Sequence, residues 1–132
     1  MTSRGPAAAL VAAVLATTPA PPRTLAESAW GGDHVGVTAS RDGMRLDFDC
    51  AHGTIDGPIA LDADGRFDVR GTYTKESPGP VRPGASGGEA ARYVGRIDGD
   101  AMTLAVVLVG SDEKVGSFTL QKDRLPRVHK CQ

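Results

Sequence analysis

The sequence lacks several features that would place the protein in a familiar class. It has 15 lysines and arginines against 16 acidic residues, so its formal net charge is −1. Phosphate binding needs a clustered cationic surface, and this balance argues against a nucleic-acid partner. An apolar stretch at 7–16 is shorter than the roughly 18 residues that a membrane-spanning helix needs. We therefore predict no nucleic-acid partner and no membrane span in the mature protein.

Basic residues gather in one part of the sequence, its tail. They are Lys122, Arg124, Arg127 and Lys130. An acidic residue and a proline interrupt them, so we interpret this tail as the solvated face of a strand and not as a binding patch.

A hydrophobic period of 3.6 residues, which would indicate amphipathic helices, is absent after Trp30. Apolar and polar residues instead alternate with period two between glycine-rich turns, which is the pattern of half-buried β-strands. The strands predicted in this way are 35–40, 45–52, 58–61, 67–73, 92–97, 102–109 and 117–121. Asp-Gly pairs at 42–43, 64–65 and 98–99 predict hairpin turns between some of them. The fold class predicted is all-β, a single antiparallel up-and-down barrel of seven or eight short strands.

The N-terminus has the three parts of a secretory signal peptide. Arg4 precedes the apolar stretch, and small residues follow at Ser28 and Ala29. We predict a leader over 1–28, a barrel domain over 29–132, and a secreted or periplasmic location. The alternative is an alanine-rich tail that is not a leader.

The chain has two cysteines, Cys50 and Cys131. In an oxidising compartment two cysteines are expected to pair. The bond would close a loop of about 80 residues, which the chain-entropy model values at about 4.5 kcal/mol. We predict a structural disulfide.

Two further segments depart from the alternating pattern. Residues 77–90 are rich in proline and glycine, which predicts an exposed connection. The strand from Met102 to Val109 is nearly apolar on both faces. It could therefore be covered on the outside as well, by the N-terminal segment or by a second chain in an oligomer.

The candidate ligand site combines histidines and aromatic residues on strand faces that the alternating pattern otherwise assigns to the core. His52 shares a predicted strand face with Cys50, and His34 lies just after Trp30. If the two cysteine segments ran antiparallel, His52 and His129 would lie opposite each other. We predict a non-catalytic small-molecule site from Trp30, His34, His52 and Tyr73. Trp30 also has a structural interpretation, as a plug at one barrel end beside glycines that let the chain cross closely.

Two other function classes remain open. The first is a hydrolase- or isomerase-type enzyme in which His34 or His52 works with Asp33 or Asp49 as an acid–base pair. The second is a structural or protein-interaction domain that uses the 102–109 strand as its contact surface. Three histidines near acidic residues could also bind zinc or copper if they converged, but we predict no metal and no cofactor.

Four segments carry a resemblance to known proteins. They are Trp30-Gly-Gly-Asp-His34, Asp47-Phe-Asp-Cys-Ala-His-Gly53, Gly65-Arg-Phe-Asp-Val-Arg-Gly-Thr-Tyr73 and Arg127-Val-His-Lys-Cys131. They look like a group of small exported bacterial proteins with no assigned function, and the architecture resembles the small barrels of the lipocalin and avidin type. The resemblance implies a barrel and an exported location, and it transfers no catalytic residue. The Trp-Gly-Gly opening differs from the lipocalin order Gly-x-Trp, which argues against a roomy cavity.

Overall fold

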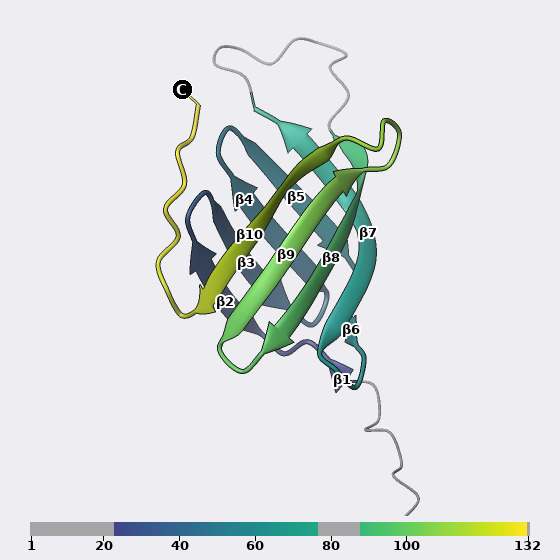
Figure 1. Cartoon of the computed structure of the whole chain (residues 1–132), viewed down its shortest axis with the longest axis vertical. Coiled ribbons are helices and arrows are strands. Elements are labelled where there is room, and N and C mark those ends of the chain that lie inside the picture. The colour runs from purple at the N-terminus through teal and green to yellow at the C-terminus, as the bar shows by residue number, and fades with distance from the viewer. Residues whose placement is uncertain (1–22, 77–87, 132) are drawn as a thin grey trace, which may run out of the picture.

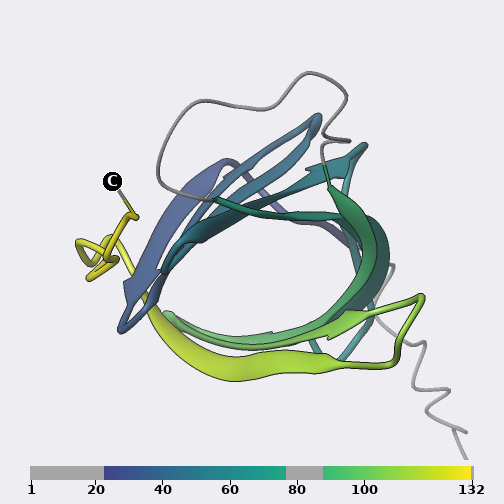
Figure 2. The same cartoon turned by 90° about the horizontal axis from the view of Figure 1, so that it is seen from above.

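The computed structural model describes residues 23–76 and 88–131, and these residues form an all-β fold (Figure 1). Its strands are β1 (Arg23–Thr24), β2 (Ser28–Gly32), β3 (Val35–Ser40), β4 (Gly43–Phe48), β5 (Ala51–Asp56), β6 (Ala60–Leu61), β7 (Arg66–Lys75), β8 (Glu89–Asp98), β9 (Ala101–Leu108) and β10 (Lys114–Lys122). Within the described residues, β2–β5 and β7–β10 close into an antiparallel barrel in the order β10-β2-β3-β4-β5-β7-β8-β9. The predicted up-and-down barrel is confirmed, and Figure 2 shows its ring from above.

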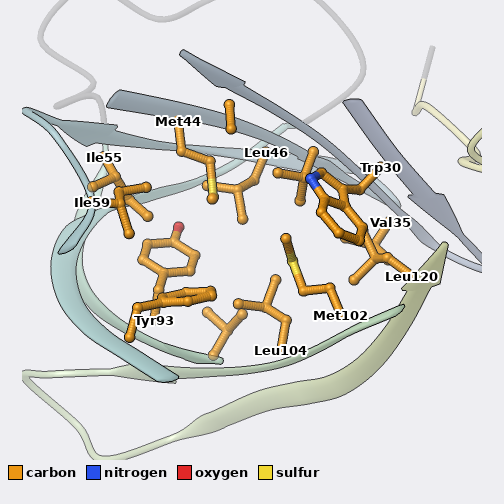
Figure 3. Close-up of a cluster of buried hydrophobic side chains, with 14 of the residues drawn as sticks. Trp30, Val35, Met44, Leu46, Ile55, Ile59, Tyr93, Met102, Leu104 and Leu120 are labelled. Atoms are coloured by element: carbon orange, nitrogen blue, oxygen red, sulfur yellow. The ribbon is translucent and has the colours of Figure 1, made fainter. Parts of the chain in front are cut away.

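The barrel interior is filled by apolar side chains that alternate with polar ones along each strand. On β4, for example, Met44, Leu46 and Phe48 are buried and the intervening residues are not. The labelled side chains in Figure 3 point inward from both sides of the ring. No polar or charged residue is among the buried residues of the described chain. An eight-stranded barrel is just wide enough for such side chains to fill it.

Tyr93 of β8 occupies one side of this interior because the next two strands of the ring, β7 and β5, carry glycine there. A Cβ on Gly53 of β5 would overlap the Tyr93 hydroxyl, and a Cβ on Gly71 of β7 would lie 3.1 Å from its ring. The hydroxyl donates a hydrogen bond to the carbonyl oxygen of Thr72 at 2.7 Å. Burial raises the pKa of Tyr93, so this hydroxyl stays protonated.

One end of the barrel carries a small ladder of β1 and β6, seen at the lower end of Figure 1. Leu25 donates its backbone N–H to the carbonyl oxygen of Ile59 at 2.8 Å, and both side chains are buried. The predicted leader, 1–28, overlaps this ladder, because Leu25 belongs to the described core. Residues 1–22 lie outside the described residues. So does most of the predicted 77–90 connection, since β8 already begins at Glu89.

The prediction of a single strand over 45–52 is wrong. β4 ends at Phe48 and β5 begins at Ala51, so Asp49 and Cys50 form a two-residue turn with Phe48 opposite Ala51. Cys50 adopts a positive φ of 52°, which its sequence does not announce as an Asp-Gly pair would. Since a slip of one residue exchanges the two faces of a strand, Ala51 faces inward and His52 does not.

The predicted strand at 58–61 is shorter than expected and lies outside the barrel. Only Ala60 and Leu61 are extended, and they pair with β1. The turn after them agrees with the prediction: the Asp62 carboxylate accepts the backbone N–H groups of Asp64 and Arg66, both at 2.9 Å. The turns that follow β3 and β8 also lie at predicted Asp-Gly pairs, 42–43 and 98–99.

The packing of Tyr93 over Gly53 can be tested by a double-variant cycle. Gly53→Ala should lower the free energy of unfolding by about 2 kcal/mol, because the added methyl group overpacks the interior. Tyr93→Phe should cost about 1 kcal/mol for the lost hydrogen bond. The double variant should be more stable than the sum of these costs predicts, since the clashing hydroxyl is gone. Urea unfolding of all four proteins is the measurement, and strictly additive costs would contradict this packing.

Candidate functional site

The structure does not bring the four residues of the predicted ligand site together. Trp30 and Tyr73 are core residues, 3% and 7% exposed, and the Trp30 indole N–H donates to Ser28 Oγ at 2.9 Å. His34 lies in the β2–β3 turn with 63% of its side chain exposed, and His52 lies on the outward face of β5. Two of the four therefore point into the barrel and two lie outside it.

The C-terminal residues 124–131, here called the strap, leave the end of β10 and run back along the outside of the barrel (yellow in Figures 1 and 2). Arg127 donates its backbone N–H to the Gly32 carbonyl at 3.0 Å and accepts the backbone N–H of His34 at 2.7 Å. Cys50 donates its backbone N–H to the His129 carbonyl at 3.0 Å. The interpretation of the basic tail as a strand face is therefore wrong beyond Lys122, because β10 ends there.

Two outward glycines let the strap lie close to the sheet. Gly31 of β2 and Gly36 of β3 are cross-strand partners. A Cβ on Gly31 would overlap the carbonyl oxygen of Arg124, and one on Gly36 would lie 2.8 Å from Pro126 Cβ. A side chain at either position would hold the strap away from the barrel.

Asp49 joins the strap to two turns. Its Oδ2 lies 2.5 Å from His34 Nδ1, and its Oδ1 accepts the backbone N–H of His129 at 2.8 Å. The pKa of Asp49 is lowered, first by the hydrogen bond from His129 and then by His34. Both carboxylate oxygens are thus engaged in holding the chain.

Lys130 forms a second anchor. Its ammonium group donates to the carbonyl oxygens of Ala51 at 2.7 Å and Phe48 at 3.3 Å, and lies 3.1 Å from Glu76 Oε1. The same Glu76 oxygen lies 2.9 Å from His52 Nδ1. Hydrogen bonds from His52 first and Lys130 second lower the pKa of Glu76.

The three histidines therefore do not form one centre. The His34 side chain and the His129 backbone N–H contact Asp49, whereas the His52 side chain contacts Glu76. The opposed placement of His52 and His129 is not found, because β5 lies between β4 and β7, where the strand partners of His52 are Asp47 and Thr74. In the described part of the chain, no group of three or more histidine, cysteine or acidic side chains is arranged to hold a metal ion.

The predicted Cys50–Cys131 disulfide is present in the structure. Its Cα atoms lie 4.8 Å apart and its cysteines are 81 residues apart in the sequence. It fixes the end of the strap to the β4–β5 turn, beside the anchors at Asp49 and Lys130. A disulfide of this kind points to an oxidising, extracytoplasmic environment.

A hollow of about 880 Å³ lies on the outer face of β7–β10, next to β6. Two rows of cross-strand partners line it, namely Asp68–Val94–Ala105–Ser117 and Arg66–Arg96–Thr103–Thr119. The hollow is on the outside because these side chains are exposed or half-exposed, whereas Phe67 and Leu104 between them are buried. Small side chains on neighbouring strands leave the space open.

Arginines face one another twice along β7 and β8. Arg66 is the cross-strand partner of Arg96, and Arg70 that of Arg92. Asp68 accepts hydrogen bonds from Nε and Nη2 of Arg92, at 2.8 Å for Nε, and Arg92 lowers the pKa of Asp68. This group was not predicted from the sequence, although Arg66 and Arg70, like Arg92 and Arg96, are spaced by four and so share a strand face.

A second hollow, of about 400 Å³, lies beside the strap. Asp33, His34, Ser117, Thr119, Gln121 and Arg124 are among its lining residues. His34 is the one member of the predicted ligand site that lines either of these two hollows.

Comparison of the chain with protein families, curated proteins and solved structures found no significant match. The resemblance to exported bacterial proteins and to lipocalins therefore stays a prediction. Residues 23–76 and 88–131 contain no helix that could reach across a membrane.

The strap anchors predict a loss of stability in acid. Asp49 and Glu76 have lowered pKa values in the folded protein, so their contribution is complete above the ordinary carboxyl range and is lost as the pH falls below about 4. Glu76→Gln should cost about 0.5–1 kcal/mol at neutral pH and should flatten this loss, because it removes one titrating anchor. Urea unfolding from pH 7 to pH 3 is the measurement. The exposed Glu113, changed to Gln, is the control, and the same pH profile for both variants would contradict the anchor role of Glu76.

Proposed function

We propose that this protein is an exported, non-catalytic binding module that holds a small molecule on the outer face of β7–β10. The hollow of about 880 Å³ on that face is the observation that carries the proposal. Small-molecule sites occupy about 300–1,000 Å³, so its size is suitable. The predicted function, small-molecule binding, is kept, while its site moves from Trp30 and the histidines to the outside of the barrel.

The filled interior supports an outer site. Trp30 and Tyr93 enter the barrel from different strands and are buried with the aliphatic side chains around them (Figure 3). A ligand inside would have to displace side chains that pack at the density of a protein core, which is costly. A ligand on the outer face displaces only water.

The lining of the hollow also supports it. Val94 is 37% exposed and Ala105 is half-buried, so the floor offers apolar contact. Ser117 in the same row, and Thr103 and Thr119 in the neighbouring row, add hydroxyl groups. A mixed floor of this kind suits a molecule with a flat apolar body and a few polar groups.

The histidine–carboxylate pairs have a structural part in this proposal. His34 with Asp49 has the contact that an acid–base pair needs, but Asp49 also accepts the backbone N–H of His129. In the second pair, the Glu76 carboxylate that contacts His52 also contacts Lys130. Both pairs hold the strap, and we assign them no reaction.

Export is supported by two independent features. The disulfide between Cys50 and Cys131 suits an oxidising compartment, and the N-terminal sequence has the parts of a leader. We place the mature protein in the periplasm or outside the cell.

Binding at the outer hollow can be tested with two simple aromatic probes, 2-naphthoate and 2-naphthylmethanol. Titration of ¹⁵N-labelled protein should shift the amide signals of Val94, Ala105 and Ser117 saturably with at least one probe. Ala105→Trp should abolish these shifts by filling the hollow, with Ser117→Trp as a second filling variant. Thr38→Trp, an outward position on β3, is the control and should leave binding unchanged.

Three results would contradict the proposal. The first is no saturable shift with either probe at millimolar concentration. The second is binding that persists in both filling variants. The third is a change of the same amide signals with protein concentration alone, which would show that a second copy of the chain covers this face.

A further inference from the structure

The rim of the outer hollow carries two arginines that face one another on neighbouring strands. Arg66 and Arg96 are cross-strand partners, and like charges directly opposite on a sheet are destabilising. The second arginine pair on the same face is relieved, because Asp68 binds Arg92 through two hydrogen bonds. Within the described residues, neither Arg66 nor Arg96 takes part in an ion pair.

The two acidic residues that line the hollow, Asp62 and Asp68, already accept hydrogen bonds from other groups. Asp68 has both oxygens on Arg92. Asp62 also lines the hollow, and its Oδ1 accepts the backbone N–H groups of Asp64 and Arg66 in the turn. A sequence that keeps an unrelieved like-charge pair breaks a local rule of sheet design, and such places are expected at functional sites.

We propose that Arg66 and Arg96 bind the anionic head of the ligand, which is a small carboxylic acid with a flat apolar body. This inference rests on the proposed function and specifies its ligand. Cross-strand partners lie about 4.5–5.5 Å apart, so both guanidinium groups can reach one carboxylate. Arginine is suited to this because its planar fork binds carboxylate oxygens in pairs.

The two rows of the hollow divide the ligand between them. The row of Arg66 and Arg96 continues into Thr103 and Thr119, whose hydroxyl groups can serve further ligand oxygens. The neighbouring row offers Val94 and Ala105 to the apolar body. Adjacent strands are about 4.8 Å apart, so an aromatic ring can span the floor from one strand to the next.

The two probes separate the anionic head from the apolar body, because 2-naphthoate and 2-naphthylmethanol share a ring system and differ in charge. The acid should bind roughly tenfold more tightly than the alcohol, as expected for hydrogen bonds to a charged group. Added salt should weaken binding of the acid and leave that of the alcohol nearly unchanged. Isothermal calorimetry and amide titration give both affinities.

Arginine variants identify the residues responsible. Arg96→Gln should weaken the acid about tenfold without affecting the alcohol, and Arg66→Gln should do the same. Arg45→Gln is the matched control, an exposed arginine on β4 away from the hollow, and should change neither affinity.

The outcomes separate the two proposals. Equal affinity for acid and alcohol, or an Arg96→Gln variant indistinguishable from Arg45→Gln, would overturn the anionic head while the outer hollow still binds the alcohol. Binding of neither probe would overturn the proposed function itself.

Discussion

The width of an eight-stranded barrel is the constraint on which the rest of this structure depends. Such a ring encloses room for its own inward side chains, or at most for one small ligand. Here that room is used by apolar residues, with the ring of Tyr93 accommodated by Gly53 and Gly71. Function is therefore expected on the outside, where the sheet of β7–β10 carries small side chains between charged ones.

The strap shows how the outer surface is divided. Glycines at positions 31 and 36 remove the side chains from one outer region, and the strap covers it. The disulfide, Asp49 and Lys130 then fix the strap at the turns of one barrel end. The histidines and cysteines, which are the candidate functional residues in the sequence, lie at these attachment points of the strap. The hollow lies on another part of the outer surface, the face formed by β7–β10.

More of the fold than of the candidate site could be predicted from the sequence. Alternation with period two and the Asp-Gly turns predicted the barrel, because each depends on local geometry. The Asp49–Cys50 turn has no such signal. Because this turn was not predicted, the expected strand over 45–52 placed His52 on the core face, whereas it lies on the outward face of β5. The strap and the arginine pairs could not be predicted, because they depend on the path of the tail over the sheet and on the register between β7 and β8. Arg66 and Arg96 are 30 positions apart in the sequence and meet only through the register of β7 and β8.

A crystal structure of the protein with 2-naphthoate tests the central claim, that ligands bind outside the filled barrel, most directly. The account predicts density for the ring over Val94 and Ala105, with the carboxylate between Arg66 and Arg96 and with the interior side chains unmoved. Density for the probe inside the barrel, with Tyr93 or Trp30 displaced, would contradict it.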